Sequence, residues 1–224
     1  MASSPARPPG TLSSMQLGVL RAFFAREQGF YLTGGAALAG FHLAHRTTDD
    51  LDLFTTDPDA FARGPAVLAE VASHLGGTLA SRQRAPRFAR YVLTDPSAGG
   101  LVIDLVHEPS LDRAPERMRD GEMIVDPADE IFANKLTALV GRAEERDLID
   151  VMFLEQSGRS LDHALELALR KDGGCTPATL AWLLSEVVIP DGARLPAGVS
   201  AAALRTYVEG LVVRLRARAL PASR

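Results

Sequence analysis

The stretch from Phe30 to Phe54, FYLTGGAALAGFHLAHRTTDDLDLF, constrains the fold more than any other part of this chain. Its first four residues are mostly aromatic or β-branched and predict a strand, which the pair Gly34-Gly35 ends. Residues Ala36 to Leu43 predict a helix, and a loop then leads to a segment in which acids and apolar residues alternate. On a strand, this alternation puts Asp50 and Asp52 on one face and the intervening leucines toward the core.

These residue types indicate a site for a metal ion and a phosphate. Neighbouring carboxylates repel each other unless a cation neutralises them, and Mg²⁺ prefers oxygen ligands. A glycine turn lets the backbone approach a ligand closely, and the helix N-terminus behind it attracts phosphate. Arg46 and Thr48 lie between the turn and the acids. Alone, a glycine pair is most often a simple turn and Asp-x-Asp is most often a strand end with solvated acids, but their combination in this order favours a metal–nucleotide site.

A third acid interrupts the apolar run from Leu101 to Val106, which predicts a buried strand. Asp104 lies in the middle of that run, and a lone buried acid is costly unless it is paired or bound to a metal. The alternative is an acid at the open face of the sheet without a role. His107 follows Asp104 by three residues, so we expect it to point to the opposite face and to be structural.

After Asp104 and His107, the chain is expected to form a loop or short helix at 109–121 and a short edge strand at 122–125. Two helices are expected to follow. Asp126 is expected to cap the first helix, with Pro127 at its first position. That helix contains Lys135, one of two lysines in an otherwise arginine-rich chain. The second helix, 144–154, carries Asp147 and a possible Arg146–Asp150 ion pair on one face.

The glycine pair, the residues that follow it and D-L-D-L-F, with Arg46 just before the acids, resemble the nucleotidyltransferase fold of the DNA polymerase β superfamily. Within that superfamily the pattern is most similar to the AbiEii/AbiGii toxin family. The resemblance implies that Gly34 and Gly35 hold the triphosphate of an NTP and that Asp50 and Asp52 bind catalytic Mg²⁺, with two ions expected. It also implies that the third acid, Asp104, completes the metal site.

The resemblance extends into the second half of the chain, to about Phe153. Glu130 opens the segment E-I-x-A-N-K-L-x-A-L-x-x-R-x-x-x-R-D-x-x-D, which matches the later part of the family pattern. By resemblance, Lys135 contacts the triphosphate and Asp147 supports the site. The superfamily usually has serine at the second turn position. This chain has Gly35 there, as is common in the AbiEii branch, which leaves only backbone contacts at that position.

The sequence thus predicts an α+β protein with three parts. A disordered tail at 1–10 precedes a polymerase β-like nucleotidyltransferase core at 11–107, a small mixed sheet with flanking helices. A mainly helical part at 108–224 follows and is expected to complete the active-site cleft. Its last helices are expected at 161–169, 177–188 and 201–219, with Trp182 in their core.

Composition excludes some classes of function. The net charge of −4 provides no global basic field that would attract nucleic acid. Arginines do cluster locally at 82–90 and at 205–218. Each cluster either contacts phosphates or is a solvated face. The lone Cys175 excludes an internal disulfide and favours a cytoplasmic protein. No apolar run is long enough to span a membrane, and no signal peptide is apparent.

The predicted function is Mg²⁺-dependent transfer of a nucleotide from an NTP to an acceptor. Asp50 and Asp52 bridge the metal, Asp104 positions or deprotonates the acceptor hydroxyl, and Lys135 and Arg46 balance phosphate charge. By resemblance, the chain is the toxin of a toxin–antitoxin pair, with tRNA as acceptor and a cognate antitoxin as partner. Three alternatives remain open: a small-molecule (antibiotic) nucleotidyltransferase, a protein-modifying enzyme, and a relative that binds nucleotide or a partner without turnover.

Overall fold

The structure, a computed structural model, describes residues 11–96, 99–108, 116–193, 195–196 and 198–220. The tail predicted at 1–10 and most of the predicted loop at 109–121 therefore lie outside the described residues. The chain divides into two compact units, Met1–Pro127 and Ala128–Arg224, and each is described by itself.

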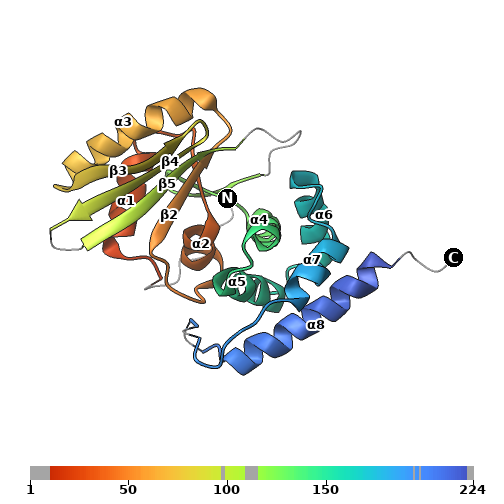
Figure 1. The fold of residues 1–224 in the computed structure, drawn as a ribbon. Helices are drawn as coiled ribbons and strands as arrows, with labels where there is room; N and C mark the ends of the chain where they lie inside the picture. The colour runs from red at the N-terminus through yellow and green to blue at the C-terminus, as the bar shows by residue number, and fades with distance from the viewer. Residues whose placement is uncertain (1–10, 97–98, 109–115, 194, 197, 221–224) are drawn as a thin grey trace. The chain divides into compact units, whose positions relative to one another are not determined.

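The first unit is built on a mixed sheet of seven strands, in the order β3-β4-β5-β2-β1-β7-β6 (Figure 1). The strands are β1 (Tyr31–Thr33), β2 (Asp50–Thr55), β3 (Thr78–Ala85), β4 (Phe88–Asp95), β5 (Gly99–His107), β6 (Met118–Asp120) and β7 (Met123–Val125). β2 runs parallel to β5, and β1 runs parallel to β7. The other neighbouring pairs are antiparallel, so the expected mixed sheet is confirmed.

Two helices, α1 (Ser14–Phe24) and α3 (Pro58–His74), cover the apolar face of the sheet (Figure 1). Ser13 caps α1 in a reciprocal capping box with Gln16, which fixes where the helix begins. Gly64 brings α3 so close to β5 that an added Cβ would lie 2.8 Å from Leu105. The buried side chains of β2 and β5 that face these helices belong to the core of the unit; they include Leu51, Leu53, Ile103 and Leu105.

One local prediction in this unit was wrong. The segment at 122–125 is not an edge strand, because β7 lies between β1 and β6, and β6 forms the edge. The helical structure predicted from Ala36 to Leu43 is present but begins earlier, as a four-residue α-helix, α2 (Gly34–Ala37), and continues as a π-helix, η1 (Leu38–Leu43). η1 ends at Ala44, which has a left-handed φ of 53°.

The second unit contains five helices among its described residues: α4 (Ala128–Gly141), α5 (Glu145–Gln156), α6 (Leu161–Lys171), α7 (Pro177–Ser185) and α8 (Ala201–Ala219). α4 packs against α5, α6 and α7, while α7 and α8 pair with each other. Side-chain hydroxyls of Ser160, Thr176 and Ser200 cap α6, α7 and α8. α4 begins at Ala128, one residue after the predicted first position Pro127, and the Asp126 carboxylate pairs with Arg117 at 3.1 Å.

The prediction that Trp182 belongs to the core was also wrong, because its side chain is 65% exposed. α7 buries Leu180 and Leu184, which are four residues apart, and Trp182 lies between them on the opposite side of the helix.

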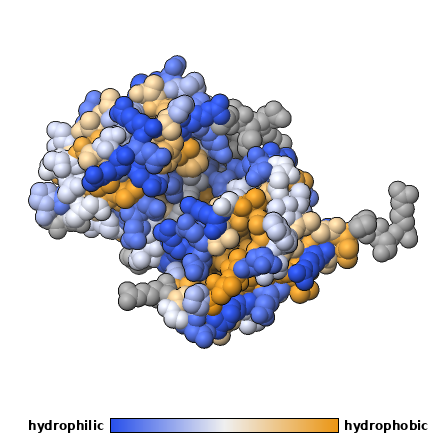
Figure 2. Space-filling view, viewed as in Figure 1, coloured by the Kyte–Doolittle hydropathy of each residue, from blue (hydrophilic) through white to orange (hydrophobic). Residues whose placement is uncertain are grey.

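Apolar surface is visible on the helical unit in Figure 2. None of the helices among the described residues is both long enough and apolar enough to cross a membrane.

Candidate active site

The register of β2 and β5 brings the predicted carboxylates together. Asp52 lies directly beside Asp104 on the neighbouring parallel strand, and Asp50 lies beside Val102. Because residues two apart on a strand share a face, Asp50, Asp52 and Asp104 all lie on one face of the sheet. The intervening Leu51 and Leu53 are buried against the opposite face, as predicted from the alternation. Neighbouring strands are only about 4.8 Å apart, so three acids are concentrated in a small area.

Gly34 lies directly against the Asp52 carboxylate. Its φ is +64°, a conformation that residues with a side chain rarely adopt. An added Cβ would also fall 2.0 Å from Oδ2 of Asp52, far inside any contact distance. The first position of α2 therefore needs glycine for two independent reasons, namely its backbone conformation and its close approach to the acid.

Gly35 leaves room for a basic side chain. A Cβ at this position would lie 2.8 Å from Nη2 of Arg46 and 3.4 Å from Oγ1 of Thr48. Nη1 of Arg46 donates a hydrogen bond to the carbonyl of Thr47 at 3.0 Å, which holds the guanidinium near the turn. Thr48 in turn donates its hydroxyl to Oδ1 of Asp50 at 2.9 Å. The turn, the basic loop and the acids are thus in direct contact within this unit.

The carboxylate of Asp104 is buried and is paired with Arg90 of β4. Nε of Arg90 donates to Oδ1 at 2.7 Å, and Nη2 donates to Oδ2 at 2.6 Å. Sequence reasoning placed Arg90 only in a basic cluster with Arg82, Arg84 and Arg87. Its pairing follows from the β4–β5 register, which puts Arg90 opposite Asp104.

The donor chemistry of this face suits a hard divalent cation, because its ligands would be carboxylate oxygens beside a glycine cradle. Among the described residues, however, no three His, Cys, Asp or Glu side chains are arranged so that they could already hold a metal ion. In the same arrangement, both oxygens of Asp104 accept hydrogen bonds from Arg90. The residues therefore have the chemistry that such an ion requires. For Asp104 to bind the ion together with Asp50 and Asp52, it would have to release Arg90.

In the helical unit, Lys135 is the centre of a buried ion cluster. Its Nζ lies 2.8 Å from Oδ1 of Asp147 and 2.8 Å from Oδ2 of Asp150. Arg142 donates its Nε to Oδ2 of Asp147 at 2.9 Å. Burial by itself lowers the pKa of Lys135, but the charges of Asp150 and Asp147 and their hydrogen bonds outweigh it, so the pKa is raised. The cluster combines two cations with two anions, and Lys135 stays charged.

Arg146, which the sequence paired with Asp150, contacts Glu144 at 3.2 Å instead. Asp150 forms an ion pair with Lys135 of the neighbouring helix α4. The predicted intrahelical pair was therefore wrong, because a buried lysine from α4 competes for the same carboxylate.

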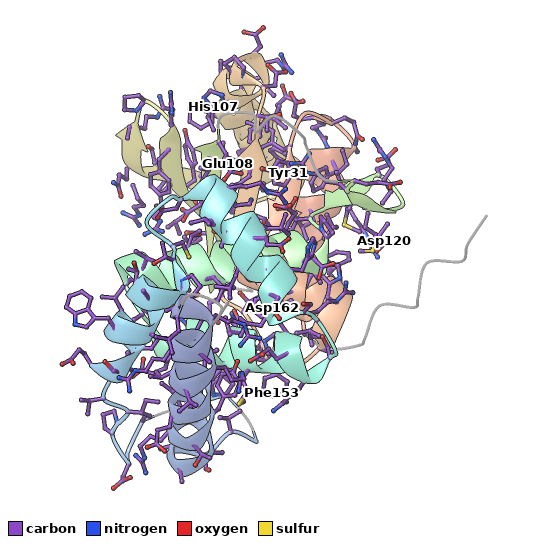
Figure 3. The ribbon with its side chains drawn as sticks, turned by 90° about the vertical axis from the view of Figure 1, so that its right-hand side faces the viewer. Tyr31, His107, Glu108, Asp120, Phe153 and Asp162 are labelled. Carbon is purple, nitrogen blue, oxygen red and sulfur yellow. The ribbon has the colours of Figure 1, made fainter. Side chains whose placement is uncertain are left out.

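His107 points away from the acids, as predicted. Its ring packs against Phe61 of α3, with ring centroids 6.0 Å apart, on the helix-covered face of the sheet (Figure 3). The next residue, Glu108, accepts a hydrogen bond from the hydroxyl of Tyr31 at 3.0 Å (Figure 3). Both residues therefore have structural partners outside the carboxylate set.

The arginines of the last helix are mostly engaged with acids of the same unit. Arg205 pairs with Asp191 at 2.7 Å, and Arg214 pairs with Glu155 at 2.6 Å. Arg218 pairs with Asp162. These pairs favour the solvated-face explanation of this cluster over an RNA-binding stripe.

Comparison with known proteins supports one family. The model of the nucleotidyl transferase AbiEii toxin of type IV toxin–antitoxin systems matches residues 19–206. A search of curated proteins found no match. Among solved structures, MenT4, a nucleotidyltransferase toxin from Mycobacterium tuberculosis H37Rv, is similar with a TM-score of 0.57 and 16% identity, over 93% of this chain and 83% of that one. JHP933 from Helicobacter pylori is similar with a TM-score of 0.54 and 21% identity, over 93% of this chain and 96% of that one.

Proposed function

Because this chain belongs to the AbiEii family, the nucleotidyltransferase toxins of type IV toxin–antitoxin systems, we propose that it transfers a nucleoside monophosphate from an NTP to tRNA with the help of Mg²⁺. One observation carries the proposal: Asp50, Asp52 and Asp104 share a sheet face beside the Gly34 turn. We further propose a cytoplasmic location, where NTP and tRNA are available, and a cognate antitoxin as partner.

Asp50, Asp52 and Asp104 are the proposed ligands of the metal. Mg²⁺ bound there, as two ions, would neutralise phosphate charge and stabilise the attacking and leaving oxygens of an in-line displacement. The hydrogen bond from Thr48 to Asp50 orients that carboxylate. The Asp52 carboxylate lies directly against Gly34, where any other residue would place its Cβ, so glycine leaves that acid the room to occupy this position.

In the proposed reaction, an acceptor hydroxyl oxygen bonds to the α-phosphorus of the NTP. The bond from that phosphorus to the bridging oxygen breaks, and pyrophosphate leaves. Asp104 positions the acceptor hydroxyl and takes its proton. Backbone N–H groups of Gly34 and Gly35 and the guanidinium of Arg46 bind the phosphates, because a planar guanidinium matches phosphate oxygens in pairs.

Lys135 is proposed to contribute its charge to the triphosphate, with Asp147 as its support. Asp147 and Asp150 keep Lys135 protonated and fix its position in the helical unit. A fixed cation of this kind stabilises charge that develops on the leaving pyrophosphate.

A transfer assay tests the proposal. Purified protein, Mg²⁺, total tRNA and each of the four α-labelled NTPs are incubated with the wild-type chain, Asp50→Asn and Asp52→Asn. Asp49→Asn is the matched control, because Asp49 precedes Asp50 in the sequence and is exposed. We expect label on tRNA from one NTP with the wild type and Asp49→Asn, and a loss of at least about 100-fold in both site variants.

Other outcomes redirect or reject the proposal. Label on a protein band, or on an added aminoglycoside, would replace tRNA with another acceptor class and keep the reaction. Unchanged transfer in Asp50→Asn and Asp52→Asn would reject the proposed metal site. Absence of nucleotide binding by the wild-type chain would leave a non-catalytic relative of the family.

A further inference from the structure

Arg90 engages both oxygens of the third carboxylate in a planar, two-pronged ion pair. The two hydrogen bonds to Asp104 are 2.7 and 2.6 Å long, and β4 and β5 place the two residues opposite each other. The sheet itself therefore aligns the guanidinium with the carboxylate, which makes the pair strong and specific in geometry. A metal ion that approaches the three acids meets Asp104 with both oxygens already bonded.

The guanidinium also lies in the field of the whole carboxylate set. Its hydrogen bond to Asp104 raises the pKa of Arg90 despite partial burial, and the charges of Asp104, Asp50 and Asp52 raise it further. Three acids on one face repel each other in the absence of a cation. Arg90 supplies positive charge to all three, which is the electrostatic task that a divalent cation would otherwise perform.

We propose that Arg90 and the divalent cation exchange at Asp104, with Arg90 holding Asp104 in the free protein and moving to a phosphate of the nucleotide when the ion enters. This inference rests on the proposed function, because it concerns the same carboxylates. Arg90 is a positioning residue here, which controls when the metal site is complete.

The side chain of Arg90 is suited to such a move. It is 45% exposed, so its head group can rotate away from Asp104 through solvent without disturbing the core. A doubly charged ion beside the guanidinium repels it, whereas triphosphate oxygens attract it and match its planar geometry. The ion and the nucleotide therefore favour the same rearrangement.

The exchange predicts thermodynamic coupling between the two ligands. Without nucleotide, the ion can bind Asp104 only by displacing Arg90, which breaks the existing ion pair between these two residues. With nucleotide, the phosphates offer Arg90 a replacement partner, so the ion binds more tightly. By linkage, the ion strengthens nucleotide binding by the same factor.

Mn²⁺ binding, measured by electron paramagnetic resonance on the full chain, tests the exchange without requiring turnover. The proteins are the wild type, Arg90→Gln, Arg90→Lys and Arg87→Gln, each with and without a non-hydrolysable NTP analogue. Arg87 is the matched control, because it lies in the turn of the same hairpin with an exposed side chain. Thermal unfolding of each variant checks that it is folded.

We expect Arg90→Gln to bind Mn²⁺ about tenfold more tightly than the wild type without nucleotide, a change of about 1.4 kcal/mol. The NTP analogue should increase the Mn²⁺ affinity of the wild type and should increase that of Arg90→Gln much less. Arg90→Lys keeps the positive charge but lacks the planar guanidinium, so its Mn²⁺ affinity should lie between those of the wild type and Arg90→Gln. Arg87→Gln should match the wild type.

Two results would overturn the inference. Equal or weaker Mn²⁺ binding by Arg90→Gln would show that Arg90 does not compete with the ion. Equal tightening in Arg87→Gln would show only a general effect of removing positive charge. Failure of the proposed function looks different: Mn²⁺ binding would then be unaffected by Asp50→Asn and Asp52→Asn, or undetectable in every protein.

Discussion

Replacing Gly34 by alanine should damage the candidate site, although it adds only a single methyl group. Two costs combine at this position. The backbone has a φ of +64°, which an alanine adopts at a cost of about 1–2 kcal/mol. The new Cβ would also lie 2.0 Å from Oδ2 of Asp52, so the carboxylate must rotate or the strand must shift.

The collision adds to the backbone cost. Forcing a side chain about 30° away from its preferred rotamer costs about 0.5–1.5 kcal/mol. Together the two effects predict that Gly34→Ala lowers the free energy of unfolding by about 1.5–3.5 kcal/mol. Because the displaced group is Asp52, the same change should also weaken Mn²⁺ binding in the presence of nucleotide.

Gly121 provides a matched control. Its φ is +60°, almost the same as that of Gly34, but a Cβ at Gly121 has no neighbour within 4 Å. Gly121→Ala should therefore cost only the backbone strain, about 1–2 kcal/mol, and leave metal binding unchanged. Urea unfolding of both variants isolates the collision as the difference between them.

The double variant Gly34→Ala/Asp52→Ala makes the test sharper. If the Asp52 carboxylate is the obstacle, its removal should bring the cost of Gly34→Ala close to that of Gly121→Ala. Equal destabilisation by Gly34→Ala and Gly121→Ala, together with normal Mn²⁺ binding by Gly34→Ala, would refute the reasoning.

Three further predictions concern other parts of the chain. Lys135→Met leaves the buried Asp147 and Asp150 without their shared cation and should lower the free energy of unfolding by about 3–5 kcal/mol in urea. Since folding raises the pKa of Lys135 above its ordinary value of 10.5, its stabilisation should be complete below pH 10.5 and be lost as the pH rises from there through the higher pKa of the folded state; a loss near neutral pH would contradict this. Gly35→Ser should push aside only the flexible end of Arg46, so unfolding should change by less than about 0.5 kcal/mol, while NTP affinity in a fluorescence titration should fall several-fold. Trp182→Ser should change stability by no more than about 0.5 kcal/mol, because that side chain is 65% exposed; a larger loss in thermal unfolding would show that it is covered.

The sequence predicted the strands of the candidate site well, for a physical reason. A strand with one buried face and one polar face alternates strictly, and this alternation fixed the orientation of Asp50 and Asp52 before their neighbours were known. The apolar run around Asp104 likewise identified a buried strand. Contacts that depend on register across the sheet could not be predicted, and the Arg90–Asp104 pair is the clearest case, since it needs the alignment of β4 with β5.

Other errors arose where tertiary packing decides between similar local patterns. Trp182 is apolar and lies in an apolar helix, yet only one side of α7 is buried. β6 is only three residues long, Met-Arg-Asp, which is too short to show an alternation, so nothing local indicated that it would cover β7 as the edge strand. The arginines of α8 looked like a basic stripe, but acids from other segments of the helical unit neutralise them.

The parallel pairing of β2 with β5 also bears on how the protein folds. The hairpins β3–β4 and β4–β5 join residues that are close in sequence, whereas β2 meets β5 only after the long intervening segment has closed into a loop. Local pairings of this kind are expected to precede distant ones. Asp104 would then pair with Arg90 before it comes to lie beside Asp52. The negative charges of β2 would therefore join a sheet face that already holds the positive charge of Arg90. A chain whose synthesis has not passed β5 carries no complete set of acids.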